Sequence, residues 1–138
     1  MQNKLSIDEM SKYLDRIFPQ VKGKYRILKL EDCLSEVQLM ATDANLRPGD
    51  TISGPTMFEL ADIAFYVAVI PVTGSGTLAL TTNVAINFLR KPLHSNLIAI
   101  ARIRKRGRHL VVGDVEIFSE DRSQLVAHAI FTYSLPPT

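Results

Sequence analysis

One carboxylate stands out because it lies in the middle of the most apolar segment of the chain. Asp62 is preceded by Leu60 and Ala61 and followed by Ile63 and Ala64. A carboxylate in such surroundings is costly unless it is paired, hydrogen-bonded or used, and loss of water makes it a better proton acceptor. We therefore interpret Asp62 as a general base or nucleophile. The alternative is an acidic side chain at a helix edge that binds the backbone or an arginine.

A second candidate group is the backbone N–H at the start of the same segment. Ser53-Gly54-Pro55-Thr56 has the residue types that begin a helix, with Ser or Gly as the cap and Pro in the first turn. Free N–H groups at a helix start can polarise a carbonyl or bind an anion, and Gly54 has no side chain to block a ligand. Gly54 could equally be a simple capping residue.

Three further polar residues could take part in the same chemistry. Glu59 precedes Asp62 by three residues, so it could be the acid or base instead, although a solvated or arginine-paired carboxylate is the simpler interpretation. Thr81 or Thr82, on the next predicted strand, could hold an attacking water near Asp62. Strand alternation places Thr81 with Asn83 on the polar face, and a strand threonine is often only a strand former.

Histidine, cysteine and serine form no catalytic or metal-binding pattern. His94, His109 and His128 are far apart and lack the spacing of metal ligands. Cys33 is the only cysteine, so it cannot form an internal disulfide. Ser53 lies outside any Gly-x-Ser-x-Gly elbow. We therefore expect no metal site, no serine hydrolase and no cofactor.

Basic residues are concentrated in two places, although the net charge of the chain is only +2. Arg90 and Lys91 form one pair. The second group spans seven positions and comprises Arg102, Arg104, Lys105, Arg106 and Arg108. A local basic patch on a nearly neutral protein suits a small polyanionic ligand as well as RNA, or is a solvated hairpin end. The net charge gives no reason to expect a nucleic-acid partner.

Size and composition are those of one globular domain over residues 1–138. Apolar residues make up 46% of the chain and charged residues 22%, which is ordinary for a soluble domain. Residues 1–4 lead into a polar helix without an apolar signal core. The most apolar stretch, 63–72, is interrupted by Pro71 and is too short to span a bilayer. We expect a cytoplasmic protein without a membrane partner.

Two helices and six strands must position these residues. Ser6 and Glu9 form a capping box that begins a polar helix, and Pro19 ends it. A second helix, over about 57–70, is apolar nearly all round and must be buried; Pro71 and 74–76 close it. Alternating or continuous apolar patterns predict strands over 25–30, 34–41, 77–89, 97–104, 110–118 and 125–133.

This order of elements predicts an α+β hotdog fold. In that fold an antiparallel sheet wraps around one long buried central helix, here with an additional N-terminal helix. One apolar helix among six long strands can be buried only if the sheet curves around it. The last four strands are expected to form a meander, whose exposed edge would be hidden by dimerisation.

The spacing of Gly54 and Asp62 has a consequence for the site. The two residues are eight positions apart on one helix, which separates them by about 12 Å. They cannot both contact one reacting carbon. Two such helices packed antiparallel about a two-fold axis would bring Gly54 of one chain to Asp62 of the other. A site of this kind requires a dimer.

Two segments of the chain resemble the PaaI-like acyl-CoA thioesterases. Residues 53–62, SGPTMFELAD, resemble the family's His-Gly-Gly…Leu-x-Asp segment, and residues 83–92, NVAINFLRKP, are similar to its strand ending in a Phe-Leu-Arg-Pro-like sequence. Gly107 also fits, and the resemblance covers about residues 30–135. It implies a hotdog homodimer, usually a dimer of dimers, that binds coenzyme A through basic residues near the dimer interface.

The resemblance also implies roles for individual residues. The helix carboxylate that acts as base or nucleophile corresponds to Asp62. The polarising amide corresponds to Gly54, and the Ser or Thr that assists the water corresponds to Thr81.

Three positions depart from the family pattern. Ser53 stands where the family has His, and Pro55, which has no N–H, replaces its second Gly. Arg47 lies near the position of the upstream Asn or Gln that orients the thioester, and it could donate to an oxygen with a different geometry.

We therefore expect an acyl-CoA thioester hydrolase that needs no cofactor, since coenzyme A is part of the substrate. The expected substrate-binding residues are Arg47, Ser53, Pro55, Asn83, Arg90, Lys91, Arg106 and Arg108. The alternative is a non-catalytic hotdog protein that binds acyl-CoA or another small ligand. A hotdog hydratase or dehydratase fits less well, because such enzymes typically pair the helix carboxylate with a His, and this helix has none.

Overall fold

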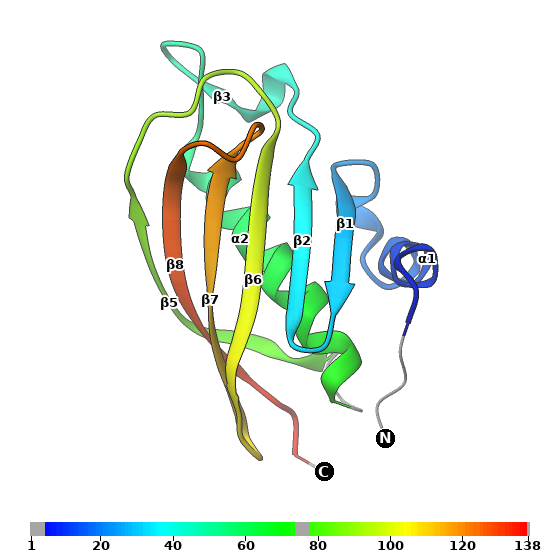
Figure 1. The fold of residues 1–138 in the computed structure, drawn as a ribbon. Coiled ribbons are helices and arrows are strands. Elements are labelled where there is room, and N and C mark those ends of the chain that lie inside the picture. The colour runs from blue at the N-terminus through cyan, green and yellow to red at the C-terminus, as the bar shows by residue number, and fades with distance from the viewer. Residues whose placement is uncertain (1–4, 74–77, 138) are drawn as a thin grey trace.

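The computed structural model describes residues 5–73 and 78–137, in which one curved sheet wraps around one helix (Figure 1). The main elements are α1 (Ile7–Ile17), β1 (Tyr25–Glu31), β2 (Leu34–Leu39), α2 (Gly54–Val69), β5 (Leu80–Phe88), β6 (Leu97–Arg106), β7 (Leu110–Ser119) and β8 (Leu125–Ser134). The short elements are η1 (Pro19–Val21), η2 (Asp43–Asn45), β3 (Leu46–Arg47), β4 (Thr51–Ile52) and η3 (Ile70–Val72). This arrangement confirms the predicted α+β hotdog fold.

The N-terminal helix α1 forms as its sequence predicts. Ser6 caps it, and the side chain of Glu9 returns a hydrogen bond to the backbone of Ser6. Met10 and Leu14 are buried, so that α1 packs its apolar stripe beside β1 at one edge of the sheet (Figure 1).

The order of the strands differs from the predicted four-stranded meander. The sheet has the order β1-β2-β6-β7-β8-β5, so β6 pairs with β2 and only β6, β7 and β8 form a meander. The segment between β5 and β6 crosses over the end of the sheet (Figure 1). Alternate residues of β6, Leu97, Ala99 and Ala101, are fully buried, which suits a central strand, whereas most of β5 is exposed. β5 is therefore an edge strand.

Helix α2 is buried because small and large apolar residues cover almost its whole circumference. Leu60, Ala64, Phe65 and Val67 have no exposed surface. The helix begins at Gly54 with Ser53 as its cap and Pro55 in its first turn, as the residue types of 53–56 predict.

The apolar segment is longer than predicted. Helical structure runs through Gly54–Val72, which by length and composition alone could cross a bilayer. The prediction that the apolar segment is too short to span a bilayer considered only residues 63–72. It is wrong on length, because it omitted the first turns of α2. The sheet explains the apolar composition, since 61% of this segment's most apolar window is buried within the fold. The predicted helix-closing residues 74–76, strand residue 77 and polar start 1–4 lie outside the described residues.

Candidate active site

Asp62 projects from α2 toward β5 and β8, where two hydroxyl groups bind it. Its Oδ1 accepts a hydrogen bond of 2.9 Å from Thr81 Oγ1 and one of 2.7 Å from Tyr133 Oη. The Tyr133 hydroxyl also lies 2.9 Å from the backbone carbonyl oxygen of Asp62. Within 5–73 and 78–137, no basic side chain forms an ion pair with Asp62. The carboxylate is thus held by neutral donors, and the arginine pairing considered as its alternative is not found there.

A β-bulge turns Thr81 toward Asp62. Thr81 pairs with Tyr133, but the next pair is Asn83 with Thr132, so Thr82 has no partner in the register. A bulge of this kind redirects the neighbouring side chain. Thr81 therefore shares the helix-facing side with Tyr133, whereas Asn83 shares the outer face with Thr132. The predicted common face for Thr81 and Asn83 is wrong, and Asn83 does not lie with Asp62.

Asp62 lines a pocket whose walls combine apolar and aromatic side chains with polar hydroxyl and carboxylate groups. The pocket has a volume of about 240 Å³. Its lining comes from α1, η1, α2 and the sheet edge, and consists of Ile17, Phe18, Asp62, Ile63, Tyr66, Ala79, Leu80, Thr81 and Tyr133. A carboxylate with two hydroxyl donors at the wall of such a pocket can act as a base or nucleophile toward a small bound acyl group.

Tyr133 belongs to this site, although no pattern in the sequence selects it. Its side chain is only 2% exposed. Burial, and then the charge of Asp62, raise the pKa of the Tyr133 phenol far above its usual range. Tyr133 therefore stays neutral and able to donate. It is 71 residues from Asp62, and only the strand register brings the two together.

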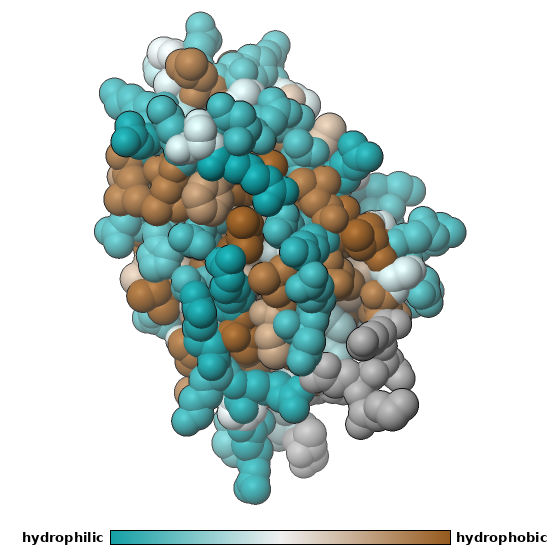
Figure 2. Space-filling view, viewed as in Figure 1, coloured by the Kyte–Doolittle hydropathy of each residue, from teal (hydrophilic) through white to brown (hydrophobic). Residues whose placement is uncertain are grey.

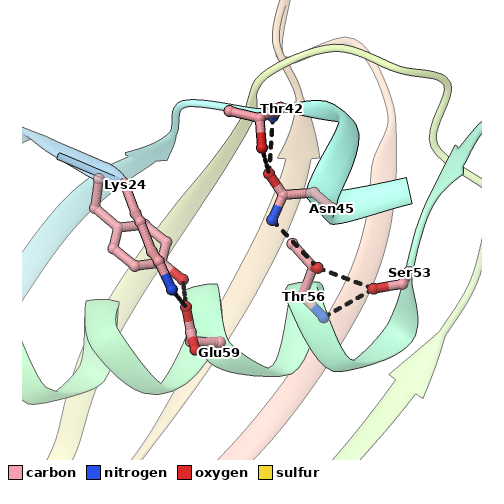
Figure 3. Close-up of polar contacts among 7 residues, drawn as sticks. Lys24, Thr42, Asn45, Ser53, Thr56 and Glu59 are labelled. Atoms are coloured by element: carbon pink, nitrogen blue, oxygen red, sulfur yellow. Dashed lines mark hydrogen bonds and ion pairs between the residues drawn. The ribbon is translucent and has the colours of Figure 1, made fainter. Parts of the chain in front are cut away.

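Gly54 is the first residue of α2, and its N–H has no acceptor within the helix. The ring of Phe88 packs over it, because a Cβ added to Gly54 would lie 3.4 Å from Phe88 Cζ. Ser53 serves the helix: its Oγ accepts from the Thr56 N–H at 3.2 Å and donates to Thr56 Oγ1 at 2.9 Å (Figure 3). Pro55 follows in the first turn without an N–H to offer.

A second pocket surrounds Gly54, with a volume of about 440 Å³. Three basic residues line it: Arg47 from the short strand β3 before α2, and the adjacent pair Arg90 and Lys91 from the segment after β5. Its remaining lining is mostly apolar and consists of Thr51, Ile52, Met57, Phe88, Leu89 and Pro92. In the described part of the chain these three cations have no ion pair. The pocket therefore offers free positive charge beside a helix N-terminus.

The longer basic run does not form one patch. Arg102 forms an ion pair with Glu116 at 2.9 Å, and Arg104 forms one with Asp114 at 2.6 Å. Arg106 donates to the carbonyl of Val72, beyond the C-terminal end of α2.

The basic run and the second pocket lie at opposite ends of α2. Arg106 is the last residue of β6 and the exposed Arg108 follows it, whereas Arg90 and Lys91 lie near the N-terminal end of α2. One chain does not bring these two predicted groups of substrate-binding residues together.

Glu59 points away from both pockets and is held by partners of its own. The Tyr25 hydroxyl donates to Glu59, and Lys24 Nζ lies 3.8 Å from the Glu59 carboxylate (Figure 3). Glu59 is thus a half-exposed carboxylate paired with a lysine and a tyrosine, which agrees with its interpretation as a solvated or paired residue except that the partner is not an arginine. Asn45 joins the loop to the helix: its amide accepts from the Thr42 N–H at 2.8 Å and donates to Thr56 Oγ1 at 3.4 Å (Figure 3).

Histidine lies away from the Asp62 carboxylate. His128 contacts Asp114 on the outer face of the sheet at 3.2 Å. Across the described ranges, no three His, Cys, Asp or Glu side chains gather in a way that could hold a metal ion.

Comparisons with known proteins converge on one group. A family model described as the thioesterase superfamily matches residues 49–126. A solved structure of a proposed thioesterase from Silicibacter sp. TM1040 is 40% identical, with a TM-score of 0.88 over 99% of this chain and 96% of that one. A search of curated proteins gave no match.

More distant structures share the fold. The PaaI protein from the phenylacetic acid degradation operon of Escherichia coli is 21% identical, with a TM-score of 0.76 over 96% of this chain and 97% of that one. A Streptococcus mutans protein solved with bound acetyl-CoA is 24% identical, with a TM-score of 0.74 over 83% of this chain and 90% of that one.

Proposed function

This chain belongs to the thioesterase superfamily and has its PaaI-like hotdog fold, and we propose that it hydrolyses acyl-CoA-type thioesters at a site shared by two copies. The observation that carries the proposal is the Asp62 carboxylate, held by Thr81 and Tyr133 at the wall of a pocket. In this position it can take a proton from water or attack a carbonyl carbon directly.

In the proposed reaction, Asp62 of one chain and Gly54 of its partner act on the same thioester carbonyl group. Asp62 takes a proton from a water held near Thr81, and the water oxygen bonds to the thioester carbonyl carbon. The Gly54 N–H stabilises the negative charge that develops on the carbonyl oxygen. The C–S bond then breaks, and the thiolate of coenzyme A leaves and recovers the proton from Asp62.

A dimer is part of the proposal, because Gly54 and Asp62 of one chain are about 12 Å apart along α2. The two pockets lie at opposite ends of β5: Leu80 and Thr81 line the Asp62 pocket, and Phe88 lines the Gly54 pocket. If two β5 edges pair antiparallel about a two-fold axis, the start of one strand meets the end of the other. Each Asp62 pocket then adjoins the partner's Gly54 pocket.

The surface of the sheet edge supports this pairing. Leu80 is 70% exposed and Phe88 is 50% exposed on an edge strand with free backbone groups. Figure 2 shows apolar side chains along the margin of the molecule that β5 forms. Exposed strand edges with large apolar residues are normally covered by another chain.

The basic pocket supports coenzyme A as the carrier group. Arg47, Arg90 and Lys91 carry free positive charge that suits phosphate groups, and the distant Streptococcus relative was solved with acetyl-CoA. No further cofactor is proposed, since coenzyme A enters as part of the substrate.

The alternative is a binding protein without catalysis, and two observations favour it. Ser53 is committed to capping α2 through Thr56, and Pro55 cannot donate a hydrogen bond. If the site is catalytic, stabilisation of the oxyanion depends on the Gly54 N–H and on Arg47.

An acyl-CoA panel with a thiol-trapping reagent separates the two functions. We expect turnover by the wild-type protein and a loss of roughly a thousandfold in Asp62→Ala, with circular dichroism confirming that the variant folds. Saturable binding without turnover in either protein would establish the binding function. Turnover that Asp62→Ala retains would exclude the proposed mechanism.

A further inference from the structure

We propose that Tyr133 is a positioning residue that, together with Thr81, holds Asp62 through Oδ1 and leaves Oδ2 as the reactive oxygen. This inference rests on the proposed function and deepens it. It assigns different tasks to the two oxygens of one carboxylate.

The geometry places both donors on the same oxygen. Thr81 Oγ1 and Tyr133 Oη approach Asp62 Oδ1 at 2.9 and 2.7 Å. Thr81 and Tyr133 face each other as register partners on β5 and β8, so one cross-strand pair supplies both hydroxyls. Among the described residues, no hydrogen bond reaches Oδ2. That oxygen is the one left to contact water or substrate.

The ring of Tyr133 is fixed by its neighbours. It meets Phe65 edge-on, with ring centroids 4.8 Å apart, and Phe131 at 6.2 Å. Because the side chain is fully enclosed, its hydroxyl has no freedom to follow a moving carboxylate. Packing against Phe65 and Phe131 thus holds the Tyr133 hydroxyl in place, and this hydroxyl in turn holds the Asp62 carboxylate.

The electrostatics give this contact a defined direction. Tyr133 is neutral, since burial and the negative charge nearby raise the pKa of its phenol. A neutral phenol can donate its O–H to a carboxylate oxygen, so the hydrogen bond runs from Tyr133 to Asp62. Tyr133 is therefore expected to hold the carboxylate in one orientation.

The same helix provides a matched control. Tyr25 donates to Glu59, also on α2, and burial and the nearby carboxylates likewise raise the pKa of the Tyr25 phenol. Glu59 lines neither pocket. Tyr25→Phe and Tyr133→Phe thus remove the same atom from two tyrosine–carboxylate pairs, only one of which faces a pocket.

The first test is the steady-state kinetics of thioester hydrolysis by the wild-type protein, Tyr133→Phe and Tyr25→Phe. In Tyr133→Phe we expect kcat to fall about tenfold with KM within about twofold, because a hydrogen bond to a charged group is lost. Thermal melts check that each variant folds, and Tyr25→Phe should keep the wild-type kcat and KM. A wild-type kcat in Tyr133→Phe, or an equal loss in both variants, would contradict the role of Tyr133.

The second test needs no activity. In protein with ¹³C-labelled aspartate, the Asp62 carboxyl signal is assigned by its absence in Asp62→Asn and compared between proteins at one pH. Its chemical shift should change in Tyr133→Phe, which loses the hydrogen bond to Oδ1, and stay unchanged in Tyr25→Phe. An unchanged signal in Tyr133→Phe, or an equal change in both variants, would overturn the role of Tyr133. If the wild type hydrolyses no thioester, the proposed function fails while this signal still decides the role.

Discussion

Gly113 of β7 lies directly against the ring of Phe65, and this contact sets how closely α2 approaches the sheet. A Cβ at Gly113 would be 2.4 Å from Phe65 Cε1 and 2.2 Å from the carbonyl oxygen of Arg102. Neither neighbour can give way easily, because Phe65 is fully buried among other aromatic rings and the Arg102 carbonyl belongs to the adjacent strand. The position of the helix, and hence of Asp62, depends on a residue without a side chain.

Gly113→Ala is therefore expected to destabilise the fold by about 3 kcal/mol, as overpacking of a core does. Urea unfolding followed by circular dichroism measures the free energy of unfolding. The control is Gly54→Ala, whose added Cβ meets only ordinary van der Waals contact with Phe88. A Gly113→Ala protein as stable as the wild type would show that α2 can move away from β7 at little cost.

Gly54→Ala should separate stability from activity. We expect its free energy of unfolding to stay within about 0.5 kcal/mol of the wild type, because alanine is well tolerated in a helix. The added methyl group would occupy the space beside the Gly54 N–H, so kcat/KM should fall at least about tenfold. Steady-state kinetics on the same preparation used for unfolding checks both. Full activity in Gly54→Ala would remove Gly54 from the site.

The helices and strands are largely predictable from the sequence because their signals are local. The capping box of α1, the apolar circumference of α2 and the alternation of the strands each lie within a few turns of chain. The order of the strands is not local. β5 and β6 are neighbours in the sequence, but β6 pairs with β2 and β7 in the middle of the sheet, whereas β5 pairs with β8 at its edge.

The candidate site is also only partly predictable from the sequence, because only some of its residues have a local signal. A charge within an apolar helix singles out Asp62, and helix-start residues single out Gly54. Tyr133 carries no such signal, because a tyrosine in a strand is ordinary. The bulge at Thr81 is equally invisible, since it depends on how β5 pairs with β8. The sequence also does not show which basic residues are free. Arg102 and Arg104 are ion-paired only because the register of β6 with β7 brings acidic residues beside them.

Removal of charge from the basic pocket should weaken substrate binding without a large effect on kcat. Arg90→Gln is expected to raise KM for an acyl-CoA about tenfold, the loss of one charge-assisted hydrogen bond to phosphate. The effect should shrink in high salt. Arg102→Gln is the matched control, because Arg102 is already paired with Glu116. Equal effects in the two variants would indicate that total charge matters, and not this pocket.

Asp114 should make the stability of the sheet depend on pH at the acidic end. Burial acts to raise the pKa of Asp114, but hydrogen bonds from Arg104 and His128 outweigh it and hold the pKa below its usual value. A lowered pKa in the folded state stabilises the fold above the unfolded value of about 3.9. That stability is lost as pH falls through the lowered folded value.

Urea unfolding at several pH values checks this with Asp114→Asn. The variant should be less stable than the wild type by about 0.5 kcal/mol near neutral pH, as for a partly exposed ion pair. The difference should diminish as pH falls below about 4. A difference that grows toward acid pH would contradict the assigned direction.

The shared site can be tested by mixing two defective chains. In a dimer of one Asp62→Ala chain and one Gly54→Ala chain, one site combines the intact Gly54 of the first with the intact Asp62 of the second, and the other site carries both defects. Random pairing makes about half of the dimers mixed, so co-refolded protein should recover about a quarter of the wild-type activity. Activity is measured before and after co-refolding at equal protein concentration. If each chain held a complete site, the mixture would show only the mean of the two single variants, and the crossed arrangement of Asp62 and Gly54 would be wrong.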